Sequence, residues 1–348
     1  MKNLVVIGLS GGIDSSAAAY LLKEQGYDVI ALTLNLFFES DVERARRVAE
    51  HLNIPHFVLN LREEFRKEIM DYFASEYRKG RTPNPCAFCN PGIKFKYLLK
   101  FAEERGADFI ATGHYARILE KEGKYYLAPA KDRKKSQEYF LALLNESVLG
   151  KTLFPLGELT KKEARKIIQE KEIPADIRKE SQDICFIGPQ GYADFLESEY
   201  GFKREKGKII SPARLVVGEH KGYYRYTIGQ RRGIGISSTE LPFTSVKGPL
   251  YVVNIDAEEN MIMVGPREYL MQTSMKVNLL VWRGEKKGNY RVKIRYRHPA
   301  AEAEVKISDN EAEVTFKEPQ FAPTPGQIAV FYNEEDLVIG AGTIEGMF

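Results

Sequence analysis

Two segments of the chain carry residue types that could do chemistry, a glycine-rich loop near its start and a cysteine pair further along. The loop runs from Gly8 to Ser16 with the sequence GLSGGIDSS, between an apolar run and a helical pattern that starts near Ser15. Glycines let backbone amides approach an anion, hydroxyl groups donate to phosphate oxygens, and the helix dipole favours negative charge at the N-terminus. The segment therefore predicts a phosphate-binding loop, with an ordinary tight turn as the alternative.

The loop differs from two common phosphate-binding motifs, because it has neither the GK[ST] ending of a Walker loop nor the GxGxxG of a dinucleotide fold. SGGIDSS instead resembles the signature of the ATP pyrophosphatase group, enzymes that cleave ATP between the α and β phosphates. The resemblance implies that ATP is bound by Gly8, Leu9, Ser10, Gly11, Gly12, Ile13, Asp14, Ser15 and Ser16. Asp14 would help to place Mg²⁺ against the leaving phosphates.

The cysteine pair is Cys86 and Cys89, in the segment TPNPCAFCN, and Cys185 is the third cysteine of the chain. Three cysteines make a poor disulfide framework for 348 residues. In a cytosolic chain a CxxC pair indicates metal binding, redox chemistry or a persulfide carrier. Because Pro83 and Pro85 stiffen the approach, we expect both sulfurs on a loop rather than in a helix.

The elements that position these residues are predicted by the spacing of apolar runs in the first third of the chain. Short buried runs such as NLVVIGL, YDVIALTLNLF and PHFVLNL alternate with amphipathic helical patterns. This alternation is typical of an α/β, doubly wound parallel sheet. The second run ends at Leu34, on the edge where nucleotides bind in open sheets, so Leu34 either packs on adenine or belongs to the core. Thr160 and Glu163 predict a capping box ahead of a further helix.

After Tyr200 the sequence changes to closely spaced β-prone runs with turn residues between them, including YYRYTIGQ, LYVVNID, MIMVG, YRVKIRYR, AEVKI, AEVTF and IAVFY. This pattern predicts two small, mainly β domains, of which the last is a β-barrel. We place the N-terminal α/β domain at residues 1–203, a central β-rich domain at 204–273 and the barrel at 274–348.

Composition narrows the class of protein. A hydrophobic fraction of 43% with 28% charged residues indicates a folded protein rather than a disordered or fibrous one. No apolar run approaches the roughly 18 residues of a membrane span, and the first residues lead straight into a strand rather than a cleavable signal. We therefore expect a cytoplasmic protein with no membrane partner.

Positive charge is concentrated in two regions, which suits a polyphosphate partner. Residues 203–232 carry nine Lys and Arg against two acids, and residues 276–297 carry eight against one. In the second region Arg291, Lys293, Arg295 and Arg297 alternate with Val292, Ile294 and Tyr296. Strand geometry would send the four cations to one face and the apolar side chains to the core. A solvated sheet surface is the alternative.

Six motifs occur in the order found in bacterial tRNA-specific 2-thiouridylases, which the chain resembles over essentially its whole length. They are NPCAFCN with IKF downstream, ATGHYAR at 111–117, KSQEYFL at 135–141, FPLG at 154–157, ICFI at 184–187 and YTIGQRRGIGI at 226–236, and GQIAVFY follows at 326–332. The fold implied is that of adenine nucleotide alpha-hydrolases. Cys86 departs from the family pattern, because many relatives have aspartate there, in the sequence NPD.

The resemblance implies residue roles as well as a fold. Cys89 would be the nucleophile, Cys185 the persulfide carrier, Gly113 an ATP contact and His114 a tRNA contact. The other implied or candidate tRNA contacts are Asn84, Pro85, Cys86, Lys135, Ser136, Gln137, Arg231, Arg232, Arg295, Tyr296 and Gln327. Lys94 is a further candidate for supporting the phosphates, with an exposed helix lysine as the alternative.

The implied reaction is tRNA 2-thiouridine synthesis by an ATP-dependent tRNA-uridine 2-sulfurtransferase. A uracil oxygen is a poor leaving group, so ATP would first adenylate O2 of the wobble uridine and release pyrophosphate. Sulfur would then attack C2 and AMP would leave. The substrates implied are the tRNAs for Lys, Glu and Gln, and the sulfur donor is either inorganic sulfide or a persulfide carrier protein.

Two sulfur routes stay open at this point. Cys86, Cys89 and Cys185 could ligate three corners of a [4Fe–4S] cluster, with sulfide carried on the open iron. The other route uses a persulfide on Cys185 without a cluster, with Cys86 a bystander. Three cysteines that all lie in motif positions favour the cluster. The rival functions are another ATP pyrophosphatase acting on a small molecule, and a non-catalytic RNA-binding iron–sulfur protein.

Overall fold

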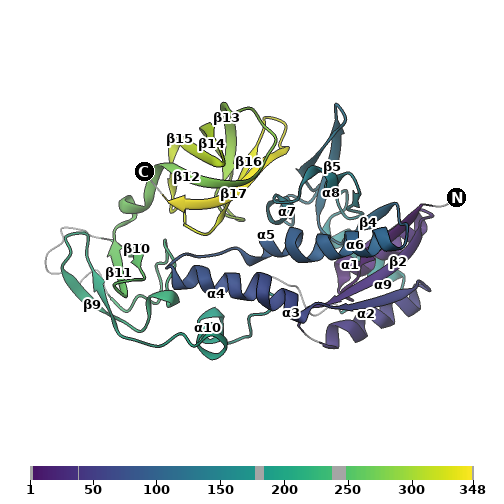
Figure 1. Ribbon diagram of the computed structural model, residues 1–348, viewed down its shortest axis with the longest axis horizontal. Coiled ribbons are helices and arrows are strands. Elements are labelled where there is room, and N and C mark those ends of the chain that lie inside the picture. The colour runs from purple at the N-terminus through teal and green to yellow at the C-terminus, as the bar shows by residue number, and fades with distance from the viewer. Residues whose placement is uncertain (1–2, 38, 177–183, 237–247, 347–348) are drawn as a thin grey trace.

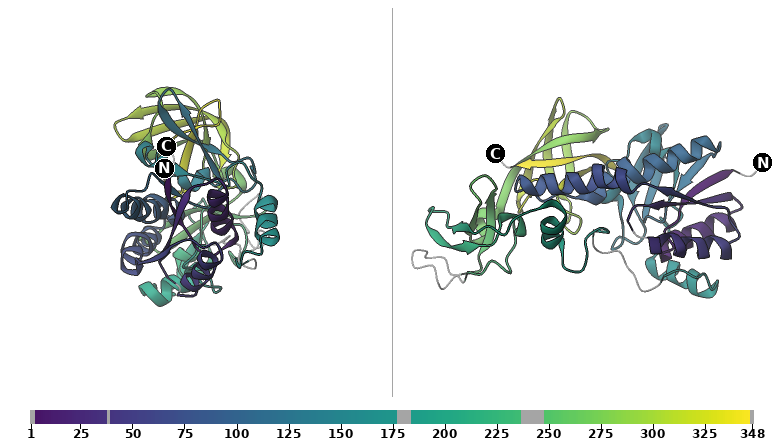
Figure 2. Two further views of the ribbon diagram at one scale, coloured as in Figure 1. Left: turned by 90° about the vertical axis from the view of Figure 1, so that its right-hand side faces the viewer. Right: turned by 60° about the horizontal axis from the view of Figure 1, so that its bottom comes forward.

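The chain forms an elongated molecule with an α/β domain at one end and a small β-sheet at the other (Figure 1). The computed structural model describes residues 3–37, 39–176, 184–236 and 248–346. A β-barrel lies above the middle of the molecule, and two helical segments run beneath it between the ends (Figures 1 and 2).

The N-terminal domain is built on a five-stranded sheet with the order β3-β2-β1-β4-β7. All its neighbouring strands are parallel. The strands are β1 Leu4–Gly8, β2 Asp28–Asn35, β3 His56–Asn60, β4 Phe109–Ala111 and β7 Thr152–Leu153. From β1 the strand order first runs outward to β2 and β3, and it then continues on the other side of β1 with β4 and β7. Ligands of open α/β sheets bind outside the carboxyl ends of the strands at such a reversal of strand order. The glycine-rich loop and the segment after β4 are therefore neighbours at the expected binding edge.

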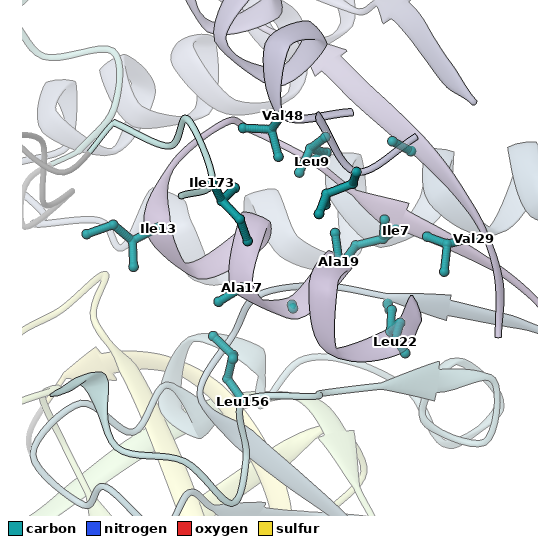
Figure 3. Close-up of a cluster of buried hydrophobic side chains, with 14 of the residues drawn as sticks. Ile7, Leu9, Ile13, Ala17, Ala19, Leu22, Val29, Val48, Leu156 and Ile173 are labelled. Carbon is teal, nitrogen blue, oxygen red and sulfur yellow. The ribbon is translucent and has the colours of Figure 1, made fainter. Parts of the chain in front are cut away.

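Helices cover both faces of this sheet, which confirms the predicted doubly wound α/β class. The helices in the described ranges are α1 Ile13–Glu24, α2 Glu39–His51, α3 Arg62–Phe65, α4 Asp71–Arg78, α5 Pro85–Cys89, α6 Lys96–Glu104, α7 Glu138–Leu141, α8 Glu146–Leu149, α9 Lys161–Glu170 and α10 Tyr192–Tyr200. Of these, α4 and α10 lie in the middle of the molecule and not on the sheet (Figure 1). Two π-helical segments, η1 Arg66–Met70 and η2 Asn90–Phe95, join α3 to α4 and α5 to α6. In Figure 3 side chains of α1 such as Ala17 and Leu22 pack between the sheet and the segment that carries Leu156 and Ile173. Burial of this apolar face fixes the start of α1, and with it the glycine-rich loop.

The central domain holds a four-stranded sheet with the order β10-β11-β8-β9. Its strands are β8 Gly207–Ile210, β9 Val216–His220, β10 Tyr251–Asp256 and β11 Met261–Gly265. The predicted run YYRYTIGQ is not a strand, because Tyr223–Arg225 forms a 3₁₀ turn, η3. Tyr224 is buried there and its hydroxyl donates to Glu197 at 2.6 Å, so side-chain anchoring prevails over β-propensity.

The C-terminal strands close into a six-stranded antiparallel barrel, as predicted. The order is β12-β15-β14-β13-β16-β17, and β12 also pairs with β17. The bounds are β12 Met271–Trp282, β13 Lys287–Lys293, β14 Ala301–Ser308, β15 Glu311–Phe321, β16 Ile328–Tyr332 and β17 Val338–Gly346, and a second 3₁₀ turn, η5 Arg267–Leu270, precedes them. Strand β12 begins three residues before the proposed boundary at 274, and the domain limits 1–203, 204–273 and 274–348 remain our proposal.

A hairpin of the N-terminal domain joins the barrel sheet. It consists of β5 Ala116–Lys121 and β6 Lys124–Pro129, and Leu127 pairs with Val338 of β17. This connection was not predicted, because the hairpin carries no clear apolar alternation. It links the segment after β4 directly to the barrel.

Helix α9 begins with the predicted capping box. The Thr160 hydroxyl accepts a bond from the Glu163 amide at 3.3 Å, and the Glu163 carboxylate accepts one from the Thr160 amide at 2.6 Å. We expect Thr160→Ala to lower the free energy of unfolding by about 1 kcal/mol, because a helix-terminal amide loses its partner. Thermal unfolding of this variant beside Thr160→Ser measures the effect. Equal melting temperatures for Thr160→Ala and the unaltered chain would show that the cap does not stabilise the helix.

None of the helices in the described ranges is long and apolar enough to pass through a membrane.

Candidate functional site

The glycine-rich loop links β1 to α1 and is closed by its own hydroxyl groups. Ser15 Oγ accepts from the Ser10 amide at 3.1 Å and lies 3.0 Å from Ser10 Oγ. Gly11 adopts φ +73°, and a Cβ there would lie 2.6 Å from the Cβ of Arg44, so only glycine fits this turn. The turn lies at the N-terminus of a 12-residue helix, where the first backbone amides have no acceptor within the helix, and such a position favours a phosphate.

The carboxylate of Asp14 lies in the first turn of α1 and receives three contacts from two donor groups. Lys161 Nζ contacts its two oxygens at 2.6 and 2.8 Å, and the Tyr115 hydroxyl donates at 2.9 Å. Lys161 comes from the first turn of α9 and Tyr115 from the segment after β4. In this arrangement the charge of the Asp14 carboxylate is balanced by the Lys161 ammonium. A Mg²⁺ ion would have to displace that ammonium or bind the carboxylate beside it.

Residues 112–115 pack against both the glycine-rich loop and the cysteine-bearing segment. A Cβ on Gly113 would lie 2.5 Å from the Ser15 backbone nitrogen, so the two backbones are in close contact. The next residue, His114, stacks on Phe95 with ring centroids 6.1 Å apart, and Phe95 ends η2. The structure therefore brings the predicted ATP contact Gly113 to the loop, and His114 to the cysteine side.

The cysteine pair lies in a helix, not on the predicted loop. Helix α5 starts at Pro85, whose missing amide is tolerated at the first helical position, and Asn84 Oδ1 caps it by accepting from the Ala87 amide at 3.3 Å. Cys89 is 5% exposed and Cys86 is half-buried. Pro85 thus starts a helix here instead of preventing one.

Cys185 is brought to this helix by the residue that follows it. Phe186 is buried and packs edge-on against Phe65 and Phe73, with centroids 5.7 and 5.3 Å apart. Cys89 belongs to the same apolar cluster, so the exposed Cys185 lies at its margin near the cysteine helix. Part of the motif before Cys185, residues 181–183 in SQDICF, lies outside the described residues.

Lys94 lies close enough to interact electrostatically with the side chains of all three cysteines. Burial lowers the pKa of Lys94 and the negative charge of the cysteine thiolates raises it, and the net shift of the Lys94 pKa is upward. Burial raises the pKa of Cys86, and it raises that of Cys89 to about 12, with Lys94 opposing both shifts. Lys94 is half-buried among the sulfurs rather than exposed on a helix. At neutral pH Cys89 is consequently a thiol and not a ready thiolate.

The three cysteines do not fit the expected cluster as they are arranged. The described part of the chain contains no group of three or more Cys, His, Asp or Glu placed to hold a metal ion. The [4Fe–4S] prediction is therefore not supported, and no step below depends on it.

His114 is held neutral. Burial, and then the charge of Lys94, lower its pKa to about 3, and Thr112 Oγ1 lies 2.8 Å from its Nδ1. Because the unfolded chain gains this proton near pH 6.5, we expect the free energy of unfolding to fall as pH decreases from 7 to 5.

In His114→Gln this decrease should be smaller, because one buried histidine no longer resists protonation. Urea unfolding at pH 7 and pH 5 measures the difference, and His51→Gln is a matched control for a histidine on the surface. The same pH dependence in His114→Gln and the unaltered chain would contradict a neutral, buried His114.

Leu34 lies near the carboxyl end of β2 and is half-buried between two apolar clusters. This position is compatible with either predicted role, packing on adenine or filling the core.

Several predicted tRNA contacts are engaged inside the protein. Ser136 is buried and binds the Ala130 amide at 2.8 Å, and Gln137 Oε1 accepts from the Tyr115 amide at 2.9 Å. Lys135, beside them, is half-buried. Asn84 and Pro85 are buried at the start of α5. These residues shape the site, and a direct RNA contact by Ser136 would require the segment to move.

The cationic run 291–297 is neither one strand, because β13 ends at Lys293, nor a free phosphate-binding face. Val292 and Ile294 are buried in the barrel as predicted, but Tyr296 packs on Phe140 of the N-terminal domain, with centroids 4.5 Å apart. Arg291 pairs with Asp336, and Lys293 Nζ lies 3.7 Å from Glu138.

Arg295 joins two domains through its guanidinium group, which donates to the Ile228 and Ala322 carbonyls at 3.0 and 3.1 Å. Burial lowers the pKa of Arg295. By contrast, Arg231 and Arg232 are exposed on the central domain, where a partner could reach them.

Lys161 and Tyr115 are the functional candidates that the sequence did not single out. Tyr115 lies within the ATGHYAR motif and Lys161 directly follows the helix cap at Thr160, so the capping signal was the available clue to the position of the lysine. The sequence did not predict that both side chains contact Asp14, because Tyr115 is 101 residues and Lys161 is 147 residues away from Asp14 along the chain.

Three family models match the chain in succession. Residues 3–189 match the tRNA methyl transferase HUP domain, residues 193–266 the tRNA methyl transferase PRC-barrel domain, and residues 271–344 the aminomethyltransferase beta-barrel domain. These three matches agree with the observed order of one α/β domain followed by two β domains.

Similar proteins cover the chain almost completely. A protein of Geobacter metallireducens is 40% identical, over 99% of this chain and 97% of its own length. A protein of Chlorobium luteolum is 43% identical over the same shares, and one of Geotalea uraniireducens is 42% identical over 99% and 95%. All three are named tRNA-specific 2-thiouridylase MnmA.

Proposed function

Because the chain belongs to the family of tRNA-specific 2-thiouridylases, we propose that it uses ATP to replace the 2-oxygen of a uridine in tRNA with sulfur. One observation carries the proposal. The segment 112–115 touches the glycine-rich loop through Gly113, and through His114 it packs on Phe95 of η2, the segment that follows the cysteine helix. The glycine-rich loop and the segment that carries two of the sulfurs therefore flank one short stretch of backbone.

In the first step the uracil O2 attacks the α-phosphate of ATP, which forms an adenylated uridine and releases pyrophosphate. The loop amides and Mg²⁺ near Asp14 would stabilise the charge on the leaving pyrophosphate. Lys161, which now pairs with Asp14, is within reach of the same region and would supply a second positive charge.

In the second step sulfur replaces the activated oxygen. A persulfide on Cys185 attacks C2 with its terminal sulfur, AMP leaves, and Cys89 then attacks the Cys185 sulfur. The products are 2-thiouridine and a Cys89–Cys185 disulfide, which an external thiol must reduce before the next turnover. Because Cys89 is a thiol at rest, it must lose its proton when it attacks, and Lys94 would stabilise the resulting thiolate.

The proposed substrate is the wobble uridine of the tRNAs for Lys, Glu and Gln, taken out of its stack to reach the cysteines. Arg231 and Arg232 are the proposed contacts that the structure leaves accessible. The sulfur donor would be a persulfide carrier protein or inorganic sulfide.

The descriptions of two matching family models name a methyl transferase, which is a different reaction. Methyl transfer needs neither a glycine-rich loop of the SGGIDSS type nor a pair of cysteines, and the chain carries both. The exchange of labelled pyrophosphate into ATP tests the proposed first step. We expect exchange that depends on unmodified tRNA, whereas exchange that needs no RNA would favour a small-molecule substrate.

The sulfur route is tested separately with iron-free protein. We expect iron-free protein to thiolate tRNA when a persulfide donor is supplied, and Cys86→Ser to retain this activity. Thiolation that instead requires bound iron and all three cysteines would establish the cluster route.

A further inference from the structure

The four residues before the cysteine helix, 81–84, are tied to the C-terminal barrel. We call this segment the strap; it joins α4 to α5 and passes beneath the barrel (Figure 1). The Thr82 amide donates to the Pro325 carbonyl at 2.9 Å. Gln327 Nε2 donates to the carbonyls of Thr82 and Pro83, at 2.8 and 3.3 Å. Three backbone groups of the strap are thus paired with the barrel.

Charged groups hold the first residue of the strap from two sides. Arg81 donates to both carboxylate oxygens of Glu345 in β17, at 2.7 and 3.0 Å. Its Nε lies 2.8 Å from a carboxylate oxygen of Glu76 in α4. Arg81 therefore links the helix before the strap to the last barrel strand.

The barrel end of this contact is itself rigidly placed. The backbone of Gln327 accepts from the Ile344 amide at 2.8 Å, and the Gly326 amide donates to the Ile344 carbonyl at 2.9 Å. Gly326 has φ +90°, and a Cβ there would lie 3.0 Å from the Thr82 carbonyl. The two backbones approach so closely that a side chain at this position would disturb the contact.

The strap ends at the residue that starts the cysteine helix. Asn84 caps α5, and Cys86 and Cys89 follow within two turns. Since Pro83 and Pro85 have restricted backbones, a displacement at Thr82 passes directly to the helix start. The orientation of the sulfurs consequently depends on contacts made by the barrel.

We propose that Gln327 is a positioning residue, which sets the cysteine helix through the Thr82 and Pro83 carbonyls. This inference rests on the proposed function and adds a second role for the barrel, that of completing the sulfur-transfer site. In this structure the side-chain amide of Gln327 is used within the chain, so the tRNA contact expected from family resemblance would require these two bonds to break.

The first test needs no RNA. Gln327→Met keeps the length of the side chain but removes its donors, and Gln272→Met makes the same change at the start of β12, where the side chain donates to Tyr269. We expect Gln327→Met to raise amide hydrogen exchange over residues 82–89 by about tenfold, because about two hydrogen bonds are lost. Alkylation of Cys89, read by mass spectrometry, should also become faster, and Gln272→Met should change neither quantity.

The second test separates positioning from RNA binding. In single-turnover assays at saturating tRNA we expect Gln327→Met to slow thiolation by about tenfold, with its Kd for tRNA within about twofold of the unaltered chain. Unchanged exchange over 82–89 together with a weakened Kd would overturn the inference and make Gln327 a tRNA contact.

Two further outcomes are informative. If Gln327→Met does not fold, Glu345→Gln weakens the same strap at the surface and should give the same pattern with a smaller effect; no change in exchange there would contradict the inference. If the unaltered chain shows no thiolation, the proposed function fails, while the exchange result still decides whether the barrel holds the strap.

Discussion

Replacing Cys185 by serine is expected to lower tRNA thiolation by at least about a thousandfold, because serine cannot carry a persulfide sulfur. Adenylation should continue, since the glycine-rich loop and Asp14 are untouched. The variant should therefore still exchange pyrophosphate into ATP in the presence of tRNA. Single-turnover assays that follow 2-thiouridine and pyrophosphate exchange in the same preparation measure both steps.

Cys86→Ser is the matched control for this experiment. Cys86 shares the cysteine helix and the charge of Lys94, but the persulfide route gives it no role. We expect thiolation by Cys86→Ser within a few-fold of the unaltered chain. Equal loss of activity in Cys86→Ser and Cys185→Ser would contradict the persulfide route, and bound iron in the active protein would then favour the cluster.

Asp14→Asn is expected to lower tRNA-dependent pyrophosphate exchange by about a hundredfold or more, because the carboxylate that would place Mg²⁺ is lost. The Tyr115 hydroxyl can still donate to the asparagine oxygen, so the start of α1 should keep its conformation. Thermal unfolding then confirms that the fold is intact, and filter binding should show unchanged affinity for tRNA.

Glu24→Gln, at the exposed far end of α1, removes one negative charge from the same helix and should leave exchange unaffected. Lys161→Met should weaken exchange as well, since it removes the cation that pairs with Asp14. Full exchange activity in Asp14→Asn would show that this carboxylate does not take part in ATP cleavage.

The fold was predictable where one face of an element is buried in a regular period. The runs around Val5 and Val29 predicted a parallel sheet, and those around Val292 and Val314 predicted barrel strands; all four residues are in the core. The prediction was wrong around Tyr224, because this β-prone segment forms a 3₁₀ turn that is held by a hydrogen bond from the Tyr224 hydroxyl to Glu197. Contacts between domains could not be predicted from the sequence. The alternation around Arg295, for example, does not reveal that its guanidinium donates to the Ile228 carbonyl of the central domain.

The candidate site was predictable as a set of motifs but not as an arrangement. The loop SGGIDSS carries its own chemistry in glycines and hydroxyls, so its role could be inferred locally. The state of Cys89 could not, because its raised pKa depends on burial in a cluster that includes Phe186. Lys161 was missed because its candidate role depends on a contact between distant parts of the chain. Its ion pair with Asp14 cannot be inferred from a lysine at a helix start.

The most direct test of the central claim is mass spectrometry of nucleosides from unmodified tRNA after one turnover with the protein, ATP and a persulfide donor. The account predicts 2-thiouridine at the wobble position and one AMP for each sulfur transferred, with none formed when ATP is omitted. Uridine that stays unmodified, or that becomes methylated when a methyl donor is supplied, would contradict it.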